Sequence, residues 1–249
     1  MKITVIMSVY NTPTEYLERC INSIYASCVM TGFYEETEVL ICDDGSTEQD
    51  TIDMLHDLIS KYSNMTLFTN DTNRGVSYSL NKLISHAQGK YIAQMDSDDF
   101  MRPERLRIQY RHLEQHPEIT GVFSNTFNFV DKFSDIEKVQ YWFENEVVIS
   151  TVQEYIEFGG ALHPSFFYKR EDVVNNNIKY DEHYIVAHDY DYIMNILYHH
   201  CKLQCMRDKL IAYLRHSNSL TIKKKDIGKE EGREITKKGG TVVPPFFII

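Results

Sequence analysis

Short apolar runs alternate with segments of helical periodicity over the first hundred residues, and this alternation restricts the possible folds more than any other feature. The apolar runs cover residues 1–9, 38–42, 65–69 and 91–95. Between them, apolar residues recur at the spacing of one helix face. Four strands that alternate with three helices predict an α/β fold, namely a doubly wound, mostly parallel sheet with helices on both faces.

Acidic residues follow two of these predicted strands. Asp43-Asp44-Gly45-Ser46 comes after the second strand, and Asp96-Ser97-Asp98-Asp99 comes after the fourth. Open α/β sheets bind their ligands at the carboxyl ends of the strands. Carboxylates packed this closely repel one another, and hard divalent ions prefer such oxygen ligands. We therefore expect a ligand and a metal at this edge, with a solvated acidic turn as the alternative for the second cluster.

Capping patterns predict where helices begin and end. Thr12-Pro13-Thr14-Glu15 has the form of a capping box with proline at the first helical position, and Thr151-Val152-Gln153-Glu154 follows the same capping logic. Gly89 is expected to close the third helix as its C′ residue.

The patterns after residue 100 are less regular. Residues 131–150, which include Trp142, are as typical of a substrate-covering loop as of a structured element. We expect one domain over residues 1–222 and a poorly ordered or peripheral tail over residues 223–249, where basic and mixed charges precede an apolar end. Helices are expected after Pro103, over 151–159 and over 190–198, and strands over 120–130, 165–168 and 210–214.

Charge and cysteine content restrict the partners and the location. The 249 residues carry a formal net charge of -10, which argues against nucleic acid as the main partner because phosphate binding needs a positive surface. The five cysteines are an odd number in mostly apolar segments, as reduced thiols are, and predict a cytoplasmic protein. No apolar run reaches the ~20 residues that span a bilayer. Any membrane contact is therefore expected to be peripheral, through the C-terminal tail at the inner membrane face.

Seven short motifs occur in a fixed order along the chain. In order, spacing and element context they resemble those of the family 2 glycosyltransferases, inverting enzymes with the GT-A fold, over approximately residues 2–220. The motifs are Ser8-Val9-Tyr10-Asn11, Asp43-Asp44-Gly45-Ser46, Asn73-Arg74-Gly75, Asp96-Ser97-Asp98-Asp99, His163-Pro164-Ser165, His188-Asp189-Tyr190-Asp191 and Tyr213-Leu214-Arg215-His216-Ser217.

The resemblance implies a binding site for the nucleotide of a sugar donor. Asp43 or Asp44 would accept hydrogen bonds from the uracil N3–H and the ribose hydroxyls, as an acceptor-only carboxylate can. A plain turn with a helix cap remains the alternative for this motif. The implied donor-binding residues are Tyr10, Asn11, Asp43, Asp44, Asn73, Arg74, Gly75, Asp96 and Ser97.

The resemblance also implies a divalent cation, Mn²⁺ or Mg²⁺. Asp98 would ligate this ion where it bridges the two phosphates of the donor, and His216 would add a contact. His163 and Asp191 are implied to line the acceptor site. Either histidine can equally be an ordinary core or surface residue. A zinc site at Cys201 and Cys205 is disfavoured because no second cysteine pair follows.

Asp189 corresponds to the general base of the family, which would take the proton of the acceptor hydroxyl. His188 stands where the family often has a glutamate, and Asp191, two residues beyond Asp189, is a second candidate for the base. A carboxylate at the start of a helix is also an ordinary cap, so the alternative is a structural role.

Taken together, these features predict an inverting, metal-dependent glycosyltransferase that uses a nucleotide-sugar donor, expected to be a UDP-sugar. The acceptor would be a saccharide or a lipid-linked saccharide in surface-polysaccharide assembly. One alternative is a catalytically weak nucleotide-sugar-binding module, which the replacement by His188 keeps open. Another is a sugar-nucleotide nucleotidyltransferase, but the loop after the first strand lacks the glycines that such a phosphate loop needs.

Overall fold

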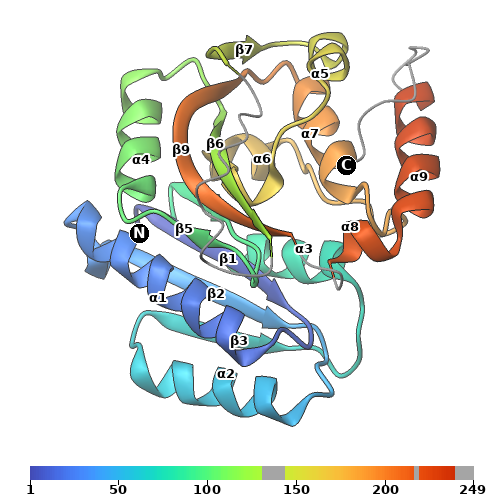
Figure 1. The fold of residues 1–249 in the computed structure, drawn as a ribbon. Helices are drawn as coiled ribbons and strands as arrows, with labels where there is room; N and C mark the ends of the chain where they lie inside the picture. The colour runs from blue at the N-terminus through green and yellow to red at the C-terminus, as the bar shows by residue number, and fades with distance from the viewer. Residues whose placement is uncertain (131–143, 216–218, 239–249) are drawn as a thin grey trace.

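A mixed sheet runs through the molecule, and helices cover both of its faces (Figure 1). The computed structural model describes residues 1–130, 144–215 and 219–238, and within them the sheet has nine strands. The strand order is β3-β2-β1-β4-β8-β6-β9-β5, with β7 paired to β9. This arrangement confirms the predicted fold class, an α/β protein with helices on both faces of the sheet.

The first half of the sheet is parallel, and its register places the strand ends side by side. Val9 pairs with Asp43, and Asp43 pairs with Thr69, so that these strands end at one edge. The elements of this half are β1 (Ile3–Val9), α1 (Thr14–Thr31), β2 (Thr37–Asp43), α2 (Gln49–Lys61), β3 (Met65–Thr69), α3 (Val76–His86) and β4 (Tyr91–Gln94). The predicted alternation of four strands and three helices is confirmed.

The second half of the sheet mixes both directions. β8 runs antiparallel to β4 and to β6, and β9 runs parallel to β6 but antiparallel to β5 and β7. The elements are β5 (Phe100–Met101), α4 (Arg105–Gln115), β6 (Gly121–Val130), β7 (Val147–Ile149), α5 (Val152–Phe158), β8 (Phe167–Lys169), α6 (Arg170–Asn175), α7 (His188–Tyr198) and β9 (Leu203–Arg215). β9 begins seven residues before the strand predicted from residue 210.

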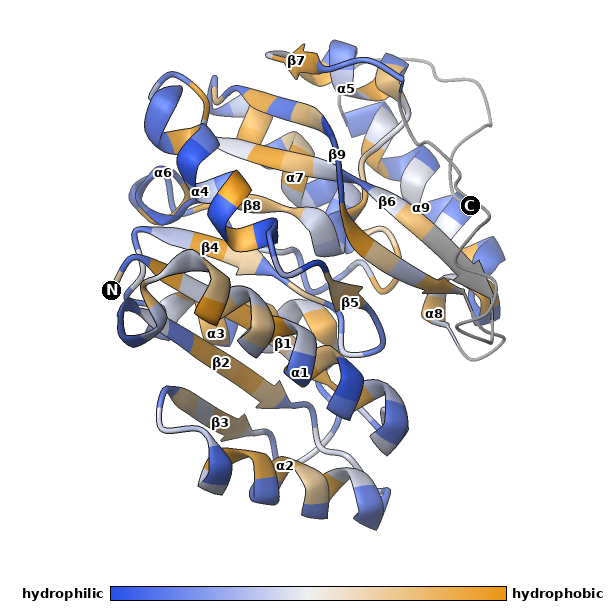
Figure 2. Ribbon diagram, turned by 60° about the vertical axis from the view of Figure 1, so that its left-hand side comes forward, coloured by the Kyte–Doolittle hydropathy of each residue, from blue (hydrophilic) through white to orange (hydrophobic). Residues whose placement is uncertain are grey.

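Alternating side chains of the sheet feed two separate cores. Ile3, Val5 and Met7 of β1 pack with apolar residues of α1, α2 and α4. Ile6 of the same strand points the other way, into a core shared with α3, α5, α6, α7 and α9 (Lys225–Lys238). Figure 2 shows apolar residues along the strands and polar residues on the outer sides of the helices. Both faces of the parallel strands are therefore buried, as the near-continuous apolar runs indicate.

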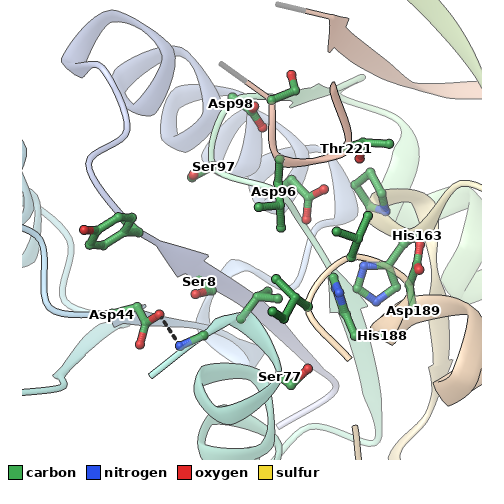
Figure 3. Close-up of a pocket in the computed structure, with 18 of the residues that line it drawn as sticks. Ser8, Asp44, Ser77, Asp96, Ser97, Asp98, His163, His188, Asp189 and Thr221 are labelled. Atoms are coloured by element: carbon green, nitrogen blue, oxygen red, sulfur yellow. Dashed lines mark hydrogen bonds between the residues drawn. The ribbon is translucent and has the colours of Figure 1, made fainter. Parts of the chain in front are cut away.

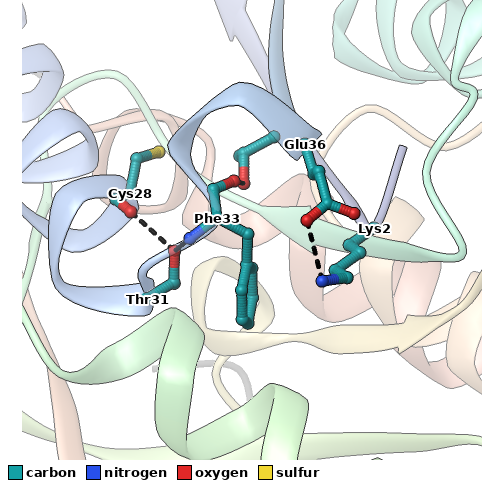
Figure 4. Close-up of polar contacts among 6 residues, drawn as sticks. Lys2, Cys28, Thr31, Phe33 and Glu36 are labelled. Carbon is teal, nitrogen blue, oxygen red and sulfur yellow. Dashed lines mark hydrogen bonds and ion pairs between the residues drawn. The ribbon is translucent and has the colours of Figure 1, made fainter.

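The turn from α1 into β2 shows how local chemistry ends a helix (Figure 4). Gly32 takes a left-handed backbone conformation with φ of 79° at the end of α1. The Thr31 hydroxyl donates to the Cys28 carbonyl at 2.6 Å and accepts from the Phe33 amide at 3.1 Å. The short helix η1 (Tyr34–Glu36) follows, and Lys2 pairs with Glu36 at 2.8 Å. These contacts bring the chain back to the start of the sheet.

One of the two capping predictions is confirmed and the other is wrong. Thr151 and Glu154 form a complete capping box at the start of α5. At α1 the N-cap is Pro13, without a side-chain cap, and the helix begins at Thr14. The Thr12 hydroxyl instead lies 2.6 Å from the Ser97 hydroxyl, because the loop after β1 packs against the acidic turn.

The prediction that Gly89 closes α3 is also wrong. The helix ends at His86, and its C-cap residue is Ala87 in an extended conformation. Gly89 is needed for a different reason, since a Cβ there would lie 2.5 Å from the backbone nitrogen of Thr4. Its amide donates to the Thr4 hydroxyl at 2.8 Å. The glycine lets the chain approach β1 before β4 begins.

Residues 223–238, the described part of the segment expected to be a poorly ordered or peripheral tail, are mostly helical. α8 (Leu220–Lys223) leads into α9, and Ile235 of α9 is buried in the core with α7. The sequence of α9 is mostly charged and contains too few apolar residues to form an apolar stripe, so it does not indicate that Ile235 is buried. Residues 239–249 lie outside the described part of the chain, as do Trp142 and most of the segment predicted as a loop, although β7 lies within that segment.

Across the described ranges, none of the helices combines the length and the apolar character that crossing a membrane requires.

Replacing Gly89 with alanine should lower the free energy of unfolding by about 2 kcal/mol, because the added methyl group overlaps the backbone of β1. Urea denaturation would measure the change. Gln88→Ala is the matched control, since Gln88 is exposed and its side chain should contribute less than about 0.5 kcal/mol. Equal stability of the two variants would contradict this account of the Gly89 turn.

Candidate active site

A cleft of about 1670 Å³ opens at the carboxyl ends of β1, β2 and β4. The first turns of α3 and α7 also line it, and so do η3 (His163–Ser165) and α8. Figure 3 shows Ser8 and Asp44 on one side, with His163, His188 and Asp189 on the other. Among the residues implicated from sequence, the cleft brings together Tyr10, Asn11, Asp44, Asn73, Arg74, Gly75, Asp96, Ser97, Asp98, His163 and Asp189.

Two of the implicated residues that the structure describes are not part of this lining. Asp43 and Asp191 do not line the cleft, and His216 lies outside the described residues. The Asp43 carboxylate accepts a hydrogen bond from the Ser46 amide at 2.9 Å and so closes the turn after β2. For Asp43 the structure therefore gives the turn-forming contact that was the alternative to nucleotide binding.

The Asp44 carboxylate organises the loop before α3. Its Oδ1 accepts from the Arg74 amide at 2.9 Å, and its Oδ2 accepts from the Gly75 amide at 2.8 Å. Asn70 and Ser79 donate to Oδ1 at 2.8 and 3.0 Å. Gly75 has φ of 89°, which a residue with a side chain rarely adopts. Asp44 thus holds the loop with which any ligand in this part of the cleft must make contact.

Asn11 shapes the opposite loop. Its side-chain oxygen accepts from the Thr47 and Glu48 amides at 2.8 and 3.1 Å, and its amide group donates to the Thr47 hydroxyl. Tyr10 beside it is 47% exposed. The Arg74 guanidinium, also exposed, lies 4.0 Å from the centre of the Tyr78 ring. The exposed aromatic and cationic groups at this rim are those that remain accessible to a ligand.

The acidic turn after β4 divides into structural and accessible carboxylates. Asp99 is fully buried, and its Oδ1 accepts from the Leu214 amide at 2.8 Å, which ties the turn to β9. Asp96 and Asp98 are partly exposed and line the cleft. Arg19 donates to the Asp98 carbonyl at 3.1 Å.

A buried arginine lies behind this turn, and sequence reasoning did not assign it a role. Arg105 is fully buried at the start of α4 and donates to the Gln94 carbonyl at 3.0 Å and to Gln109 at 2.9 Å. Burial lowers the pKa of Arg105 to about 9. This value is still above neutral pH, so the guanidinium stays charged. The negative charges of Asp99 and Asp96 raise the pKa of Arg105 and so oppose the effect of burial. Residues 102–111 contain several arginines, and nothing in the sequence distinguishes Arg105 from the others.

The electrostatics of the turn are those of an unneutralised acidic site. Burial, and then the charge of Asp98, raise the pKa of Asp96 to about 7. Asp189 raises the pKa of Asp96 further, so the two carboxyl groups interact across the cleft. A cation between Asp96 and Asp98 would relieve this repulsion. Within the described ranges, no group of three or more His, Cys, Asp or Glu is arranged to hold a metal by itself, at Cys201 and Cys205 or elsewhere.

Asp189 and Asp191 face different parts of the protein. Asp189 lines the cleft, and its Oδ1 accepts from the Tyr190 amide at 2.7 Å. Burial raises the pKa of Asp189, against the opposing effect of His188. Burial, and then Asp181, raise the pKa of Asp191 to about 6, with Lys238 of α9 opposing. Asp189 and Asp191 are two residues apart on α7, and side chains at this spacing on a helix point in nearly opposite directions.

Two histidines form the wall beside Asp189. The His163 Nε2 lies 2.7 Å from the Tyr180 hydroxyl, and the His163 and His188 rings are perpendicular at 5.7 Å. Burial lowers the pKa of both, so both imidazoles are neutral at pH 7. His163 is therefore a hydrogen-bonded residue of the cleft wall.

Three residues that line the cleft each carry a buried polar atom without a hydrogen-bond partner among the described residues. These atoms are the Ser77 hydroxyl, the Gln94 side-chain oxygen and the His188 Nδ1. A buried polar group without a partner costs free energy, and such groups in a cleft are where a polar ligand gains most. They come from α3, β4 and α7.

The glycosyl transferase family 2 model matches residues 4–175. The chain belongs to this family. The match spans the parallel strands, the loop held by Asp44 and the acidic turn, and it ends before α7, which carries His188 and Asp189. The family predicted from the ordered motifs is thereby confirmed.

Curated relatives agree with this assignment. An uncharacterized glycosyltransferase of Methanocaldococcus jannaschii is 27% identical over 215 residues, which is 85% of this chain and 70% of the relative. The Escherichia coli protein WfaP, named as a UDP-Glc:alpha-D-GlcNAc-diphosphoundecaprenol beta-1,3-glucosyltransferase, is 31% identical over 139 residues, which is 49% of this chain and 51% of WfaP.

Solved structures agree on the fold. S. aureus TarS 1-349 matches with a TM-score of 0.73 at 21% identity, covering 96% of this chain and 65% of that one. The same TarS fragment in complex with UDP-GlcNAc matches with a TM-score of 0.74 at 22% identity, covering 96% and 66%. The family 2 glycosyltransferase described here thus spans about two thirds of that TarS fragment.

The raised pKa of Asp96 makes stability depend on pH. Between the ordinary aspartate value of 3.8 and about 7, the folded protein binds a proton that the unfolded chain has released. Stability is therefore highest below this window and is lost as pH rises through it. Without divalent cations, urea unfolding at about pH 4.5 and about pH 7.5 should show a smaller loss in Asp96→Asn than in the parent. Asp71→Asn, at an exposed carboxyl before α3, is the control and should lose as much as the parent.

Proposed function

We propose that this chain transfers a sugar from a UDP-sugar to an acceptor hydroxyl, with inversion at the anomeric carbon. The observation that carries the proposal is the position of Asp189, which lines the cleft and interacts electrostatically with Asp96. A proton acceptor thus lies opposite a pair of carboxylates suited to a cation. The names of two similar proteins support the donor class, since WfaP is named for UDP-Glc and a TarS structure contains UDP-GlcNAc.

The nucleotide would bind at the rim formed by the loops after β1 and β2. Tyr10 offers an exposed ring for the base, and Arg74 offers a cation for the phosphates. Asp44 and Asn11 support this site by holding the loops, since most of their hydrogen-bonding capacity is already used.

The donor sugar would lie deeper, beside Ser77, Gln94 and His188, whose buried unpartnered polar atoms would turn toward it on binding. A sugar ring carries hydroxyl groups that donate and accept hydrogen bonds, which is what a hydroxyl, an amide oxygen and a neutral imidazole can pair with. A neutral His188 fits this role better than a second base. We therefore assign the replacement of the usual glutamate to donor binding, which leaves Asp189 to act in catalysis.

Asp98, together with Asp96, would hold a Mn²⁺ or Mg²⁺ ion. Proteins commonly bind either ion through one or two carboxylates, with substrate phosphates and water as the other ligands. The repulsion that raises the pKa of Asp96 supports this assignment. When bound, the ion would neutralise charge on the departing diphosphate. With only these two carboxylates from the protein, ion binding would depend on the phosphates of the substrate.

Asp189 would act as the general base in a single displacement. The acceptor oxygen bonds to the anomeric carbon while the bond from that carbon to the diphosphate breaks, and the leaving diphosphate keeps the electron pair. The acceptor proton moves to the Asp189 carboxylate. A raised pKa makes Asp189 a better match for this proton transfer at neutral pH.

The acceptor would be a saccharide or a lipid-linked saccharide. WfaP is named for a diphosphoundecaprenol-linked acceptor, which supports the lipid-linked class. Leu220, Ile222 and Ile227 are exposed near the cleft, and Lys223 and Lys224 line it. Apolar and cationic side chains side by side suit a membrane surface that carries such an acceptor, so peripheral membrane contact through α8 and the start of α9 is part of the proposal.

Asp189→Asn should lower the rate of sugar transfer by about 10²–10⁴-fold, because the amide cannot accept the proton. UDP binding measured by calorimetry should be unchanged. Asp191→Asn is the control and should keep near-parental transfer, since Asp191 does not line the cleft. Transfer that survives in Asp189→Asn would show that Asp189 is not the base, whereas a parent that binds UDP but transfers no sugar would favour the alternative, a nucleotide-sugar-binding module.

Asp98→Ala should remove the increase in UDP affinity that Mn²⁺ produces in the parent, because the ion loses a protein ligand. Calorimetric titration of UDP with and without Mn²⁺ measures this difference. Asp71→Ala, on an exposed loop before α3, should keep it. An unchanged Mn²⁺ effect in folded Asp98→Ala would place the ion elsewhere or show that none is used.

A further inference from the structure

The last described helix, α9, holds the segment that leads into Asp189. α9 lies alongside α7 (Figure 1), and Ile235 anchors it in the core that the two helices share. The Tyr184 hydroxyl donates to Glu234 at 3.2 Å, and Lys238 donates to the same hydroxyl. Glu231 lies three residues before Glu234 on α9, so the same face of the helix meets the chain just before α7.

One carboxylate makes the central contact. The Glu231 Oε1 accepts from the Ile185 amide at 2.8 Å, and its Oε2 accepts from the Val186 and Ala187 amides, both at 2.9 Å. Three consecutive backbone amides thus converge on one side chain that is 44 to 46 residues away along the sequence. Hydrogen bonds from amides to a carboxylate are among the strongest in proteins.

The start of α7 lacks the usual means of capping itself. Its N-cap residue is Ala187, which has no side-chain acceptor. Residues before and within the first turn of a helix leave amides that need partners, and negative charge is favourable there. Glu231, on another helix, supplies hydrogen-bond acceptors for these amides and also the negative charge. His188 and Asp189 are the first two residues of α7 after this cap, so their placement depends on it.

We propose that Glu231 is a positioning residue for Asp189. By fixing residues 185–187, it sets the first turn of α7 so that the Asp189 carboxylate faces the acidic turn across the cleft. α9 is then part of the active site without contacting substrate. This inference rests on the proposed role of Asp189 as the base.

The test compares Glu231→Gln with Glu230→Gln. The glutamine at position 231 keeps one oxygen acceptor, but its amide group cannot accept from the backbone. Glu230 is its exposed neighbour, and its replacement changes the net charge equally. We expect kcat for sugar transfer to fall at least tenfold in Glu231→Gln, while KM for the donor and the Kd of UDP stay within twofold. Glu230→Gln should behave as the parent.

A double variant separates positioning from general damage. In the Asp189→Asn background, Glu231→Gln should lower the residual rate by less than twofold, because a residue that acts through Asp189 has nothing left to position. Rate losses that multiply would overturn the proposal, and so would a kcat within twofold of the parent in Glu231→Gln. A fall in the number of UDP-binding sites in proportion to kcat indicates unfolding, and Glu231→Asp then replaces Glu231→Gln in the test.

The remaining outcomes are also decisive. If Glu231→Gln does not fold, Glu231→Asp is measured in its place; it keeps the charge but is one methylene shorter, and the same tenfold loss of kcat with unchanged Kd for UDP is required. If Asp189→Asn itself retains parental transfer, the proposed base is wrong, and this result is distinct from a failure of the Glu231 proposal, in which Asp189→Asn is inactive and Glu231→Gln is not.

Discussion

The concentration of negative charge at the end of β4 is the constraint on which the rest of the cleft depends. Asp96, Asp98 and Asp99 lie within four residues, and burial together with mutual repulsion raises the pKa of Asp96 and Asp99. Arg105 places a buried positive charge behind the turn and bonds to the Gln94 carbonyl at the end of the strand. The protein offsets part of the repulsion in this way, and the part that remains favours a cation in the cleft.

Some carboxylates of this protein accept hydrogen bonds from backbone amides, others line the cleft, and Asp44 and Asp189 do both. Asp43, Asp44, Asp99 and Glu231 each accept from the amides of a loop or strand. Asp96, Asp98 and Asp189 line the cleft. A carboxylate that accepts amides holds a loop in one conformation, which is what a preorganised site requires. The supporting carboxylates therefore matter to catalysis without taking part in it.

The fold was predictable because its first half follows local rules. Each apolar run in the first hundred residues is a strand, and parallel strands joined by helices place their carboxyl ends at one edge. Predictions failed where a residue served a distant partner. Thr12 binds Ser97 instead of capping α1, and Gly89 makes room for β1 instead of ending α3. Neither partner lies within the window of residues that a capping pattern covers.

The sequence by itself determined the fold class, the family and the edge of the sheet where the site lies, because these depend on periodicity and on the order of short motifs. Only the tertiary structure decided which carboxylates face the cleft. Asp189 and Asp191 are the same residue type two positions apart, but they point to opposite sides of α7. It also revealed Arg105 and Glu231, whose partners lie up to 61 and 46 residues away. Such contacts arise from packing between elements, and no local pattern in the chain encodes them.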